Sequence, residues 1–340
     1  MLQPTLVLML RTCFAILLAT VSTYARTNQQ ALNPSQIASL NNFGTSTSLA
    51  FPTQSLGASD ATSFLVSHGW DITKKGHVAQ ENDTSFISDP ITKDGWVYAI
   101  DYPKGSLSGT GGAEFSTYWN NSGTAFGSML VHYEVAFDPN FQWALGGKLP
   151  GLRGGSLDGC SGGKDSPDCF SVRLMWRADG KGEAYAYIAA STSFCAEKDV
   201  RCNEDGYGTS IDRGLFVFVS SGWNEVDMIV QLNNPPNSAN GIIQVYYNGL
   251  IAVNKTGLQI RSQDSITGIT GLFFSTFFGG NNASWESPID QHAYFRNFQM
   301  WASESFSKAS SGITSAQIPS IFQLLTLVGS VVLLWIPFGI

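Results

Sequence analysis

The sequence predicts an all-β protein in which two antiparallel sheets pack as a sandwich within one domain, residues 51–303. Three observations support this prediction. Short strand-like runs recur between turn residues, the 340-residue chain holds 35 glycines, and no long stretch has the periodicity of an amphipathic helix. The predicted strands, in chain order, are GWVYAIDY, AEFSTYW, SMLVHYEVAF, FSVRLMW, EAYAYIAA, GLFVFVS, EVDMIVQLN, IIQVYYN, GLFFSTFF and HAYFRNFQMW.

The N-terminal segment, residues 1–25, is typical of a secretory signal peptide. It contains one arginine, an apolar run from Cys13 to Val21, and a small residue at Ala25. Because this run is too short to span a bilayer of ~30 Å, cleavage near Ala25 is favoured over a retained anchor. The next segment, residues 26–50, is rich in Asn, Gln, Ser and Thr without periodicity, which predicts a linker or a disordered arm.

Composition limits the possible partners. The chain is 43% hydrophobic and 13% charged, with a formal net charge of -7. General binding of nucleic acid needs a basic surface, so we expect no nucleic-acid partner. An anionic ligand would have to meet a local basic pocket, and we expect the protein to be a monomer.

The cysteines agree with export from the cell. Once the signal segment is set aside, four remain, and an even number in an exported protein indicates disulfides. Three pairings are possible, and the simplest joins sequence neighbours, Cys160 with Cys169 and Cys195 with Cys202. Zinc is a poor alternative because none of the four histidines lies near a cysteine at a ligand-like spacing, so we expect no metal and no cofactor.

The C-terminal segment, residues 304–340, predicts a lipid anchor. Small residues from Ser310 to Gly312 precede a polar spacer and an apolar tail, which is the order of a glycosylphosphatidylinositol signal with attachment at Ser310. The alternative is a retained membrane helix, although no basic residue follows the tail to hold it. We therefore expect an extracellular protein tethered to the outer leaflet of the plasma membrane. Glycosylation is expected at four sequons: Asn82, Asn120, Asn254 and Asn282.

Alternation assigns faces to the hairpin SVRLMWRADGKGEAYAYIAA, residues 171–190. The apolar and small residues of its two strands belong to the core: Val172, Leu174, Trp176, Ala184, Ala186 and Ile188. The opposite face then carries Ser171, Arg173, Tyr185 and Tyr187. Directly opposite residues on one face lie ~4.5–5.5 Å apart at Cβ, so the hairpin forms a compact patch. Such a patch, taken alone, is more often a set of cross-strand partners than a site.

An upstream segment, WALGGKLPGLRGG, adds Lys148 within a glycine-rich loop. GGKLPGL, then Ser-x-Arg in SVRLMW, then Tyr-x-Tyr in AYAYIA resembles polysaccharide lyase family 14, the alginate and glucuronan lyases. Looser similarities at DYPKGS, FFSTFFGG and HAYFRNFQMW extend this resemblance over about residues 60–302. The resemblance implies a β-jelly roll whose concave sheet binds an acidic polysaccharide, and cleavage of uronate linkages by β-elimination. It also implies the functional residues Lys148, Ser171, Arg173, Tyr185 and Tyr187.

The chemistry of β-elimination suits these residue types. The proton at C5 of a uronate is weakly acidic while the neighbouring carboxylate is charged, so a cation must neutralise it first. Arg173 can make a two-point contact and Lys148 can add a point charge. Adjacent cations favour the phenolate of a tyrosine, so Tyr185 or Tyr187 is expected to move the proton while the other binds sugar. Ser171 is expected to hydrogen-bond the substrate or to orient Arg173.

Other candidates come from the remaining strands. His132 lies on a polar strand face and is a further candidate for substrate binding. Glu225 and Asp227 resemble the beginning of the acidic motif of sandwich glycoside hydrolases, but the next acid is missing. A non-catalytic, lectin-like protein is the stronger alternative, because the nine tryptophans and eleven tyrosines would also suit sugar binding.

Overall fold

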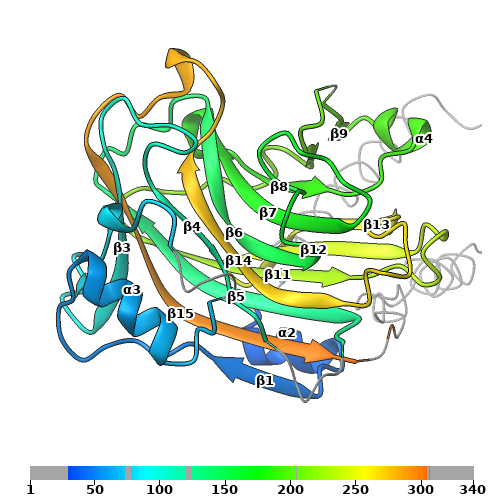
Figure 1. Cartoon of the computed structure of the whole chain (residues 1–340), viewed down its shortest axis with the longest axis horizontal. Coiled ribbons are helices and arrows are strands. Elements are labelled where there is room, and N and C mark those ends of the chain that lie inside the picture. Colours follow the sequence, from blue (N-terminus) through cyan, green and yellow to red (C-terminus); the bar gives the residue numbers. More distant parts are fainter. Residues whose placement is uncertain (1–29, 73–77, 120–124, 204, 305, 307–340) are drawn as a thin grey trace, which may run out of the picture.

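Two antiparallel sheets face each other across one apolar core, as the sequence predicted (Figure 1). The computed structural model describes residues 30–72, 78–119, 125–203, 205–304 and 306. The predicted signal peptide, Asn120 and Ser310 lie outside these residues. Within the described part of the chain, no helix is both long and apolar enough to cross a bilayer.

The larger sheet, here called the large sheet, has eight described strands. Seven follow the order β13-β12-β11-β5-β15-β3-β2, and β1 pairs with β15 outside this path. Their bounds are β1 (Thr45–Ser48), β2 (Thr84–Ser88), β3 (Trp96–Tyr102), β5 (Ser128–Phe137), β11 (Trp223–Gln231), β12 (Gly241–Tyr247), β13 (Leu250–Leu258) and β15 (Gln291–Ser303).

The second sheet, here called the small sheet, has seven described strands in the order β4-β14-β6-β7-β8-β10-β9. Its strands curve strongly in Figure 1. Their bounds are β4 (Ala113–Ser116), β6 (Gly146–Gly155), β7 (Cys169–Arg177), β8 (Gly182–Tyr187), β9 (Val200–Arg201), β10 (Thr209–Ile211) and β14 (Ile269–Phe278).

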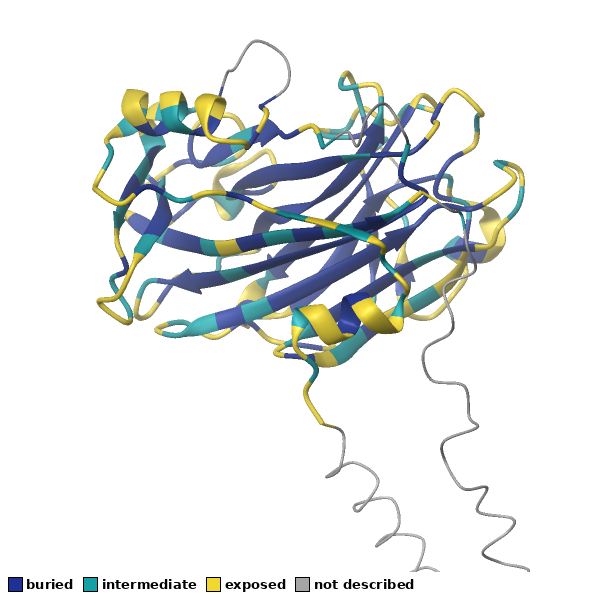
Figure 2. Cartoon of the chain, turned by 90° about the horizontal axis from the view of Figure 1, so that it is seen from below, coloured by how far each residue is buried: buried dark blue, intermediate teal, exposed yellow. Residues whose placement is uncertain are grey.

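Alternating side chains of both sheets meet in the core. Val131, Tyr133 and Val135 of β5 point toward the small sheet, and the Tyr133 hydroxyl donates to the carbonyl of Pro150 on β6 at 3.1 Å. Trp176 of β7 is fully buried among aromatic rings. Burying each large apolar side chain contributes about 1.5–3 kcal/mol, so the alternation itself selects this packing. Exposed residues lie mainly on helices and loops (Figure 2).

Helices are few and short among the described residues. The α-helices are α2 (Pro34–Leu40), α3 (Ala58–Ser67) and α4 (Thr192–Cys195), and the 3-10 turns are η1 (Glu81–Asp83), η2 (Ala178–Gly180) and η3 (Ala283–Trp285).

The segment 26–50 differs from the linker that its composition predicted. Asn33 caps α2, and its side chain and that of Gln36 form a capping box around Pro34. Ile37 of α2 is fully buried against the large sheet. Capping and one buried apolar face are enough to stabilise this short helix. The prediction of a linker is therefore wrong for the residues that form α2, and also for those of β1, which pairs with β15.

A second difference concerns GLFVFVS, residues 214–220, which was predicted to be a strand. The segment pairs only briefly, through an isolated bridge between Val217 and Lys181 and backbone hydrogen bonds to Gly180 and Gly182. Its alternation reflects mainly the burial of Phe216 and Phe218.

Both disulfides join sequence neighbours, Cys160 with Cys169 and Cys195 with Cys202, which confirms the simplest pairing. Disulfides form in oxidising compartments and therefore indicate a secreted, extracellular protein.

Candidate active site

The outer face of the small sheet carries a cleft of about 220 Å³. Arg173 of β7 stands opposite Tyr185 of β8, and both line the cleft with Lys148 and Tyr187. The structure thus brings together all four residues predicted to be catalytic. Further lining residues come from loops: Asn203, Tyr207, Asn281 and Trp285.

The GGKLPGL segment, which was predicted to be a glycine-rich loop, is instead the first part of strand β6, residues 146–152, and its composition follows from local geometry. The pairing of β6 with β7 shifts between Leu149 and Gly151, which makes a bulge at Pro150. A Cβ on Gly151 would lie 2.0 Å from the carbonyl oxygen of Val172, so only glycine allows this approach. The bulge sets Lys148 on the cleft side of the sheet beside Met175.

Arg173 is fully buried at the cleft, and part of its guanidinium is unpaired. Its Nη1 donates to Ser275 Oγ at 2.8 Å and lies 4.0 Å from a carboxylate oxygen of Glu114. Its Nε and Nη2 have no hydrogen-bond partner among the described residues. An unpaired buried donor costs roughly 1–3 kcal/mol, so this edge suits a carboxylate brought by a ligand.

Arg261 shows what a structural arginine looks like in the same protein. It is 5% exposed, and its Nε, Nη1 and Nη2 all donate, to the Asn233 carbonyl, the Ile266 carbonyl and Asn234 Oδ1. Burial alone therefore does not explain the free donors of Arg173.

Lys148 lies beneath a tyrosine ring without an acidic partner among the described residues. Its Nζ is 3.3 Å from the centroid of the Tyr185 ring and 2.7 Å from Met175 Sδ. Burial, and then the positive charges of Arg173 and Arg177, lower the pKa of Lys148 well below its usual range. An anion bound beside the amine would favour its charged form again.

The two tyrosines stand edge to face, with ring centroids 5.9 Å apart. Burial, and then the neighbouring Tyr187, raise the pKa of Tyr185, although Arg173 and Arg177 act to lower it. The two cations thus favour the phenolate of Tyr185, as expected, but burial outweighs their effect and the net result favours the phenol.

Tyr187 is positioned through its oxygen. The backbone N–H of Gly163 donates to the Tyr187 hydroxyl at 3.0 Å, which leaves the hydroxyl proton free to be donated. Gly163 belongs to the loop closed by the Cys160–Cys169 disulfide, so this loop fixes the position of the hydroxyl.

Ser171 supports this loop instead of lining the cleft. It is fully buried, and its Oγ donates to the carbonyl of Cys160 at 2.6 Å. The only hydroxyl proton of Ser171 is thus used within the protein. The predicted contact with substrate is corrected to a positioning role for the disulfide loop.

His132 does not lie in the cleft. It belongs to β5 of the large sheet, and its neighbours Val131 and Tyr133 face the core, so its side chain points to the opposite surface of the sandwich. There its Nδ1 is 3.0 Å from an oxygen of Asp227. The prediction that His132 binds the substrate is therefore wrong. Glu225 lies on the same strand and face as Asp227, so the pair considered for a hydrolase is also far from this cleft.

Sequence reasoning missed Arg153. The guanidinium carbons of Arg153 and Arg173 each lie 4.7 Å from the centroid of the Phe273 ring, so they are at most twice that distance apart. Arg153 is 4% exposed, its Nε has no partner among the described residues, and it lines a neighbouring cavity of about 630 Å³. Strict alternation along β6 from Lys148, which faces the cleft, would point the side chain of Arg153 into the core. The bulge at Pro150 shifts this alternation by one residue, so Arg153 faces the outer surface instead.

Glu183 was also missed; it is fully buried and holds Arg177, a residue that lines the cleft. Both of its oxygens are bound, Oε1 by Arg177 at 2.5 Å and Oε2 by Arg213 at 2.5 Å. Burial alone would raise the pKa of Glu183, but Arg177 and Arg213 bring it below its usual value. Arg177, which lines the cleft, is therefore paired with an anion, whereas Lys148 and Arg173 provide the positive charge of the cleft.

Comparisons with known proteins agree with this geometry. The family model for polysaccharide lyase 14 matches residues 92–298. The PL-14 alginate lyase from Aplysia kurodai is 33% identical with a TM-score of 0.64, over 75% of this chain and 100% of that chain. The alginate lyase Aly36B, in a mutant complex with alginate tetrasaccharide, is 20% identical with a TM-score of 0.58, over 76% of this chain and 97% of that one, a likeness of fold.

Among curated proteins, an exolysin of Paramecium bursaria Chlorella virus 1 is 26% identical over 197 residues. The match covers 52% of this chain and 30% of the exolysin, so the chain spans less than a third of that relative's length.

Proposed function

This chain belongs to the polysaccharide lyase 14 family, and from that premise we propose that its cleft cleaves uronate polymers of the alginate or glucuronan type by β-elimination. The observation that supports this substrate class most directly is the free edge of Arg173. Two buried donors without partners match the two oxygens of a uronate carboxylate.

Binding of the carboxylate prepares the reaction. Nε and Nη2 of Arg173 neutralise it, which makes the C5 proton of the same sugar more acidic. Lys148, charged once the anion is bound, stabilises the negative charge that develops as the proton leaves. The ring of Tyr185 covers Lys148 and offers its edge to the sugar.

Proton transfer falls to Tyr187. In its phenolate form it takes the proton from C5, and the resulting phenol returns this proton to O4 of the departing sugar. The C4–O4 bond breaks as the C4–C5 double bond forms, so atoms and charge balance. The hydrogen bond from Gly163 holds the oxygen in place through both steps.

The test is a panel of polymers assayed for ultraviolet absorbance of the new double bond. Mannuronate and glucuronate carry H5 and O4 on the same ring face, so one tyrosine serves both steps, and we expect polymannuronate and glucuronan to be cut faster than polyguluronate. Lys148→Ala and Tyr187→Phe should each lower the rate at which this absorbance appears by roughly 100-fold or more. If a neutral β-glucan gave new reducing ends without any new ultraviolet absorbance, the protein would be a hydrolase. Binding of every polymer without cleavage would indicate a lectin-like protein, and either result would overturn the proposal.

We also propose that the protein is tethered at the cell surface after cleavage near Ala25, with a glycosylphosphatidylinositol anchor at Ser310. Three of the four sequon asparagines are described and all three are exposed: Asn82, Asn254 and Asn282. Release of active enzyme from intact cells by a phosphatidylinositol-specific phospholipase would support the anchor. Retention after this treatment, with release only by detergent, would indicate a membrane helix.

A further inference from the structure

A compact group of three potential metal ligands lies on the outer surface of the large sheet, opposite to the cleft. His132 of β5 and Asp227 of β11 are directly opposite residues in the ladder, and Glu225 stands two residues before Asp227 on the same face. One ligand atom from each of the three lies within 4.8 Å of the others. The sequence argument against zinc concerned sites that include cysteine, and this group has none.

The centre of the group is a buried carboxylate that is only half satisfied. The side chains of His132 and Asp227 are 5% and 0% exposed, and Nδ1 of His132 is 3.0 Å from Oδ1 of Asp227. The second oxygen, Oδ2, is buried and has no hydrogen-bond partner among the described residues. An unpaired buried carboxylate oxygen is costly, and a bound cation would remove that cost.

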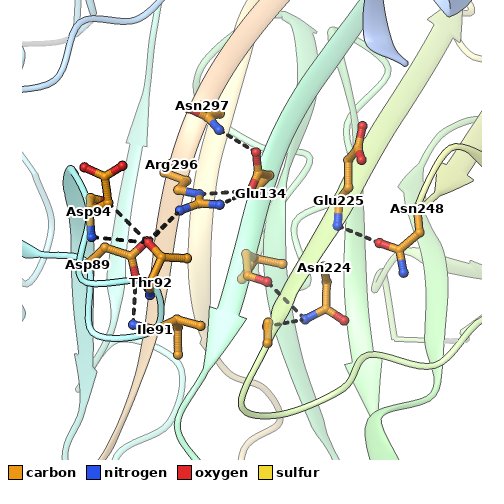
Figure 3. A network of polar contacts seen from close by, with 12 residues as sticks. Asp89, Ile91, Thr92, Asp94, Glu134, Asn224, Glu225, Asn248, Arg296 and Asn297 are labelled. Carbon is orange, nitrogen blue, oxygen red and sulfur yellow. Dashed lines mark hydrogen bonds and ion pairs between the residues drawn. The ribbon is translucent and has the colours of Figure 1, made fainter. Parts of the chain in front are cut away.

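Among the described residues near this group, no lysine or arginine is free to balance the negative charge of Asp227. Arg296, the nearby cation on β15, is engaged by Glu134 and Asp89 (Figure 3). The backbone N–H of Glu225 donates to Asn248 (Figure 3). No hydrogen bond is described for its carboxylate, which offers an oxygen within 4.8 Å of the ligand atoms of His132 and Asp227.

We propose that His132, Asp227 and Glu225 form a structural site for a divalent transition-metal ion, with zinc preferred, that joins β5 to β11. One imidazole with two carboxylates suits zinc better than calcium or magnesium, which favour oxygen ligands alone. Two ligands at ~2.0–2.1 Å from a tetrahedral zinc lie roughly 3.3 Å apart, close to the 3.0 Å between Nδ1 and Oδ1, and an Asp227 carboxylate that binds the ion through both oxygens would also satisfy Oδ2. Glu225 closes the remaining gap, and water completes the coordination.

The experiment uses the full secreted chain, purified without a histidine tag and freed of metal by a chelator. Isothermal titration with zinc chloride should show one ion per chain. At zinc 100-fold above its Kd, Tm should rise by about 5–10 °C. Cobalt(II) loading should produce the visible bands of a site with nitrogen and oxygen ligands. These measurements do not depend on lyase activity, and the inference does not rest on the proposed function.

Variants separate this site from adventitious binding. His132→Gln and Asp227→Asn should each remove both the titration and the Tm shift. Because buried variants can fail to fold, the half-exposed Glu225→Gln serves as a second test and should weaken zinc binding at least tenfold. His292→Gln is the matched control, since His292 is 2.8 Å from Asp138 in a histidine–carboxylate pair on the same sheet. No binding by the wild-type chain, or binding that persists in Glu225→Gln and is lost in His292→Gln, would overturn the proposal.

Discussion

The outer surfaces of the two sheets carry buried charge of opposite sign. On the small sheet, Lys148, Arg153 and Arg173 are 8% exposed or less, and Glu114, the acid beside Arg173, is partly exposed. On the large sheet, Asp227 is buried beside Glu225, with a histidine as its only described ionic partner. On the small sheet the buried anion Glu183 is already paired with Arg177 and Arg213, so Lys148 and Arg173 keep an excess of positive charge. On the large sheet Arg296 is already paired with Asp89 and Glu134, so Asp227 has no lysine or arginine partner among the described residues. Because unpaired buried charge costs stability, the comparison indicates what each face binds: a polymer of carboxylates on one side and a metal ion on the other.

The largest expected effect is on the cationic face. Arg173→Lys keeps the charge but removes the planar guanidinium that can make a two-point contact with a carboxylate. The kcat/KM on a uronate polymer should therefore fall on the order of 100- to 1,000-fold. Arg261→Lys is the matched control, a buried arginine whose donors are all satisfied within the fold. It should lower Tm and leave the kcat/KM of the folded fraction unchanged. Equal activity losses in both variants would mean that the free edge of Arg173 has no special role.

The two tyrosines offer the next contrast. Tyr187→Phe removes the hydroxyl that Gly163 positions, and kcat should fall roughly 100-fold or more. Tyr185→Phe keeps the ring that covers Lys148 and should cost about tenfold at most. Steady-state rates on polymannuronate distinguish them, and the reverse ranking would assign the proton transfer to Tyr185.

Removing one cation from each face should change stability in opposite directions. Lys148→Met removes a buried charge without a described acidic partner and should raise the free energy of unfolding by about 1–3 kcal/mol while abolishing activity. Arg296→Met leaves the buried Asp89 and the partly exposed Glu134 without their cation, and should lower the free energy of unfolding by about 1–3 kcal/mol with unchanged activity. Urea unfolding of both variants measures these changes. If the free energy of unfolding changed in the same direction in both variants, the proposed contrast between the two faces would be wrong.

The pH dependence of stability follows from Lys148. Its folded-state pKa is lowered, so the unfolded chain binds more protons between that pKa and the unfolded value of about 10.4. Stability contributed at Lys148 therefore rises with pH across this window. Urea unfolding at a series of pH values measures this, and the rise should be missing in Lys148→Met. If the free energy of unfolding had the same slope against pH in both proteins, Lys148 would be fully charged in the folded state.

The smallest effect concerns the support of Tyr187. Ser171→Ala removes one hydrogen bond to the disulfide loop, worth about 1 kcal/mol, and should lower kcat several-fold with little change in KM. If Ser171 acts only through Tyr187, it should have no further effect in a Tyr187→Phe background. Additive losses would indicate a separate role.

Much of the fold and the centre of the site were predictable because strands alternate with period two. This period separates Val172 and Leu174 from Arg173 on one strand, and the facing strand places Tyr185 beside it. The cysteine spacing likewise predicted both disulfides. Composition was a poorer guide, since a polar segment with one capping box became α2.

The sequence by itself determined which side chains leave the core on the regular strands, but it predicted a glycine-rich loop at GGKLPGL, where the structure has strand β6. Only the tertiary structure decided which of the two outer surfaces each residue reaches. Long-range pairing places His132 on the large sheet and Arg173 on the small one, although the strands that contain them show the same alternation of polar and apolar residues. The bulge at Pro150 turns Arg153 to the cleft. Alternation is a local property of a strand, whereas partner choice and register arise from contacts between segments far apart in the chain.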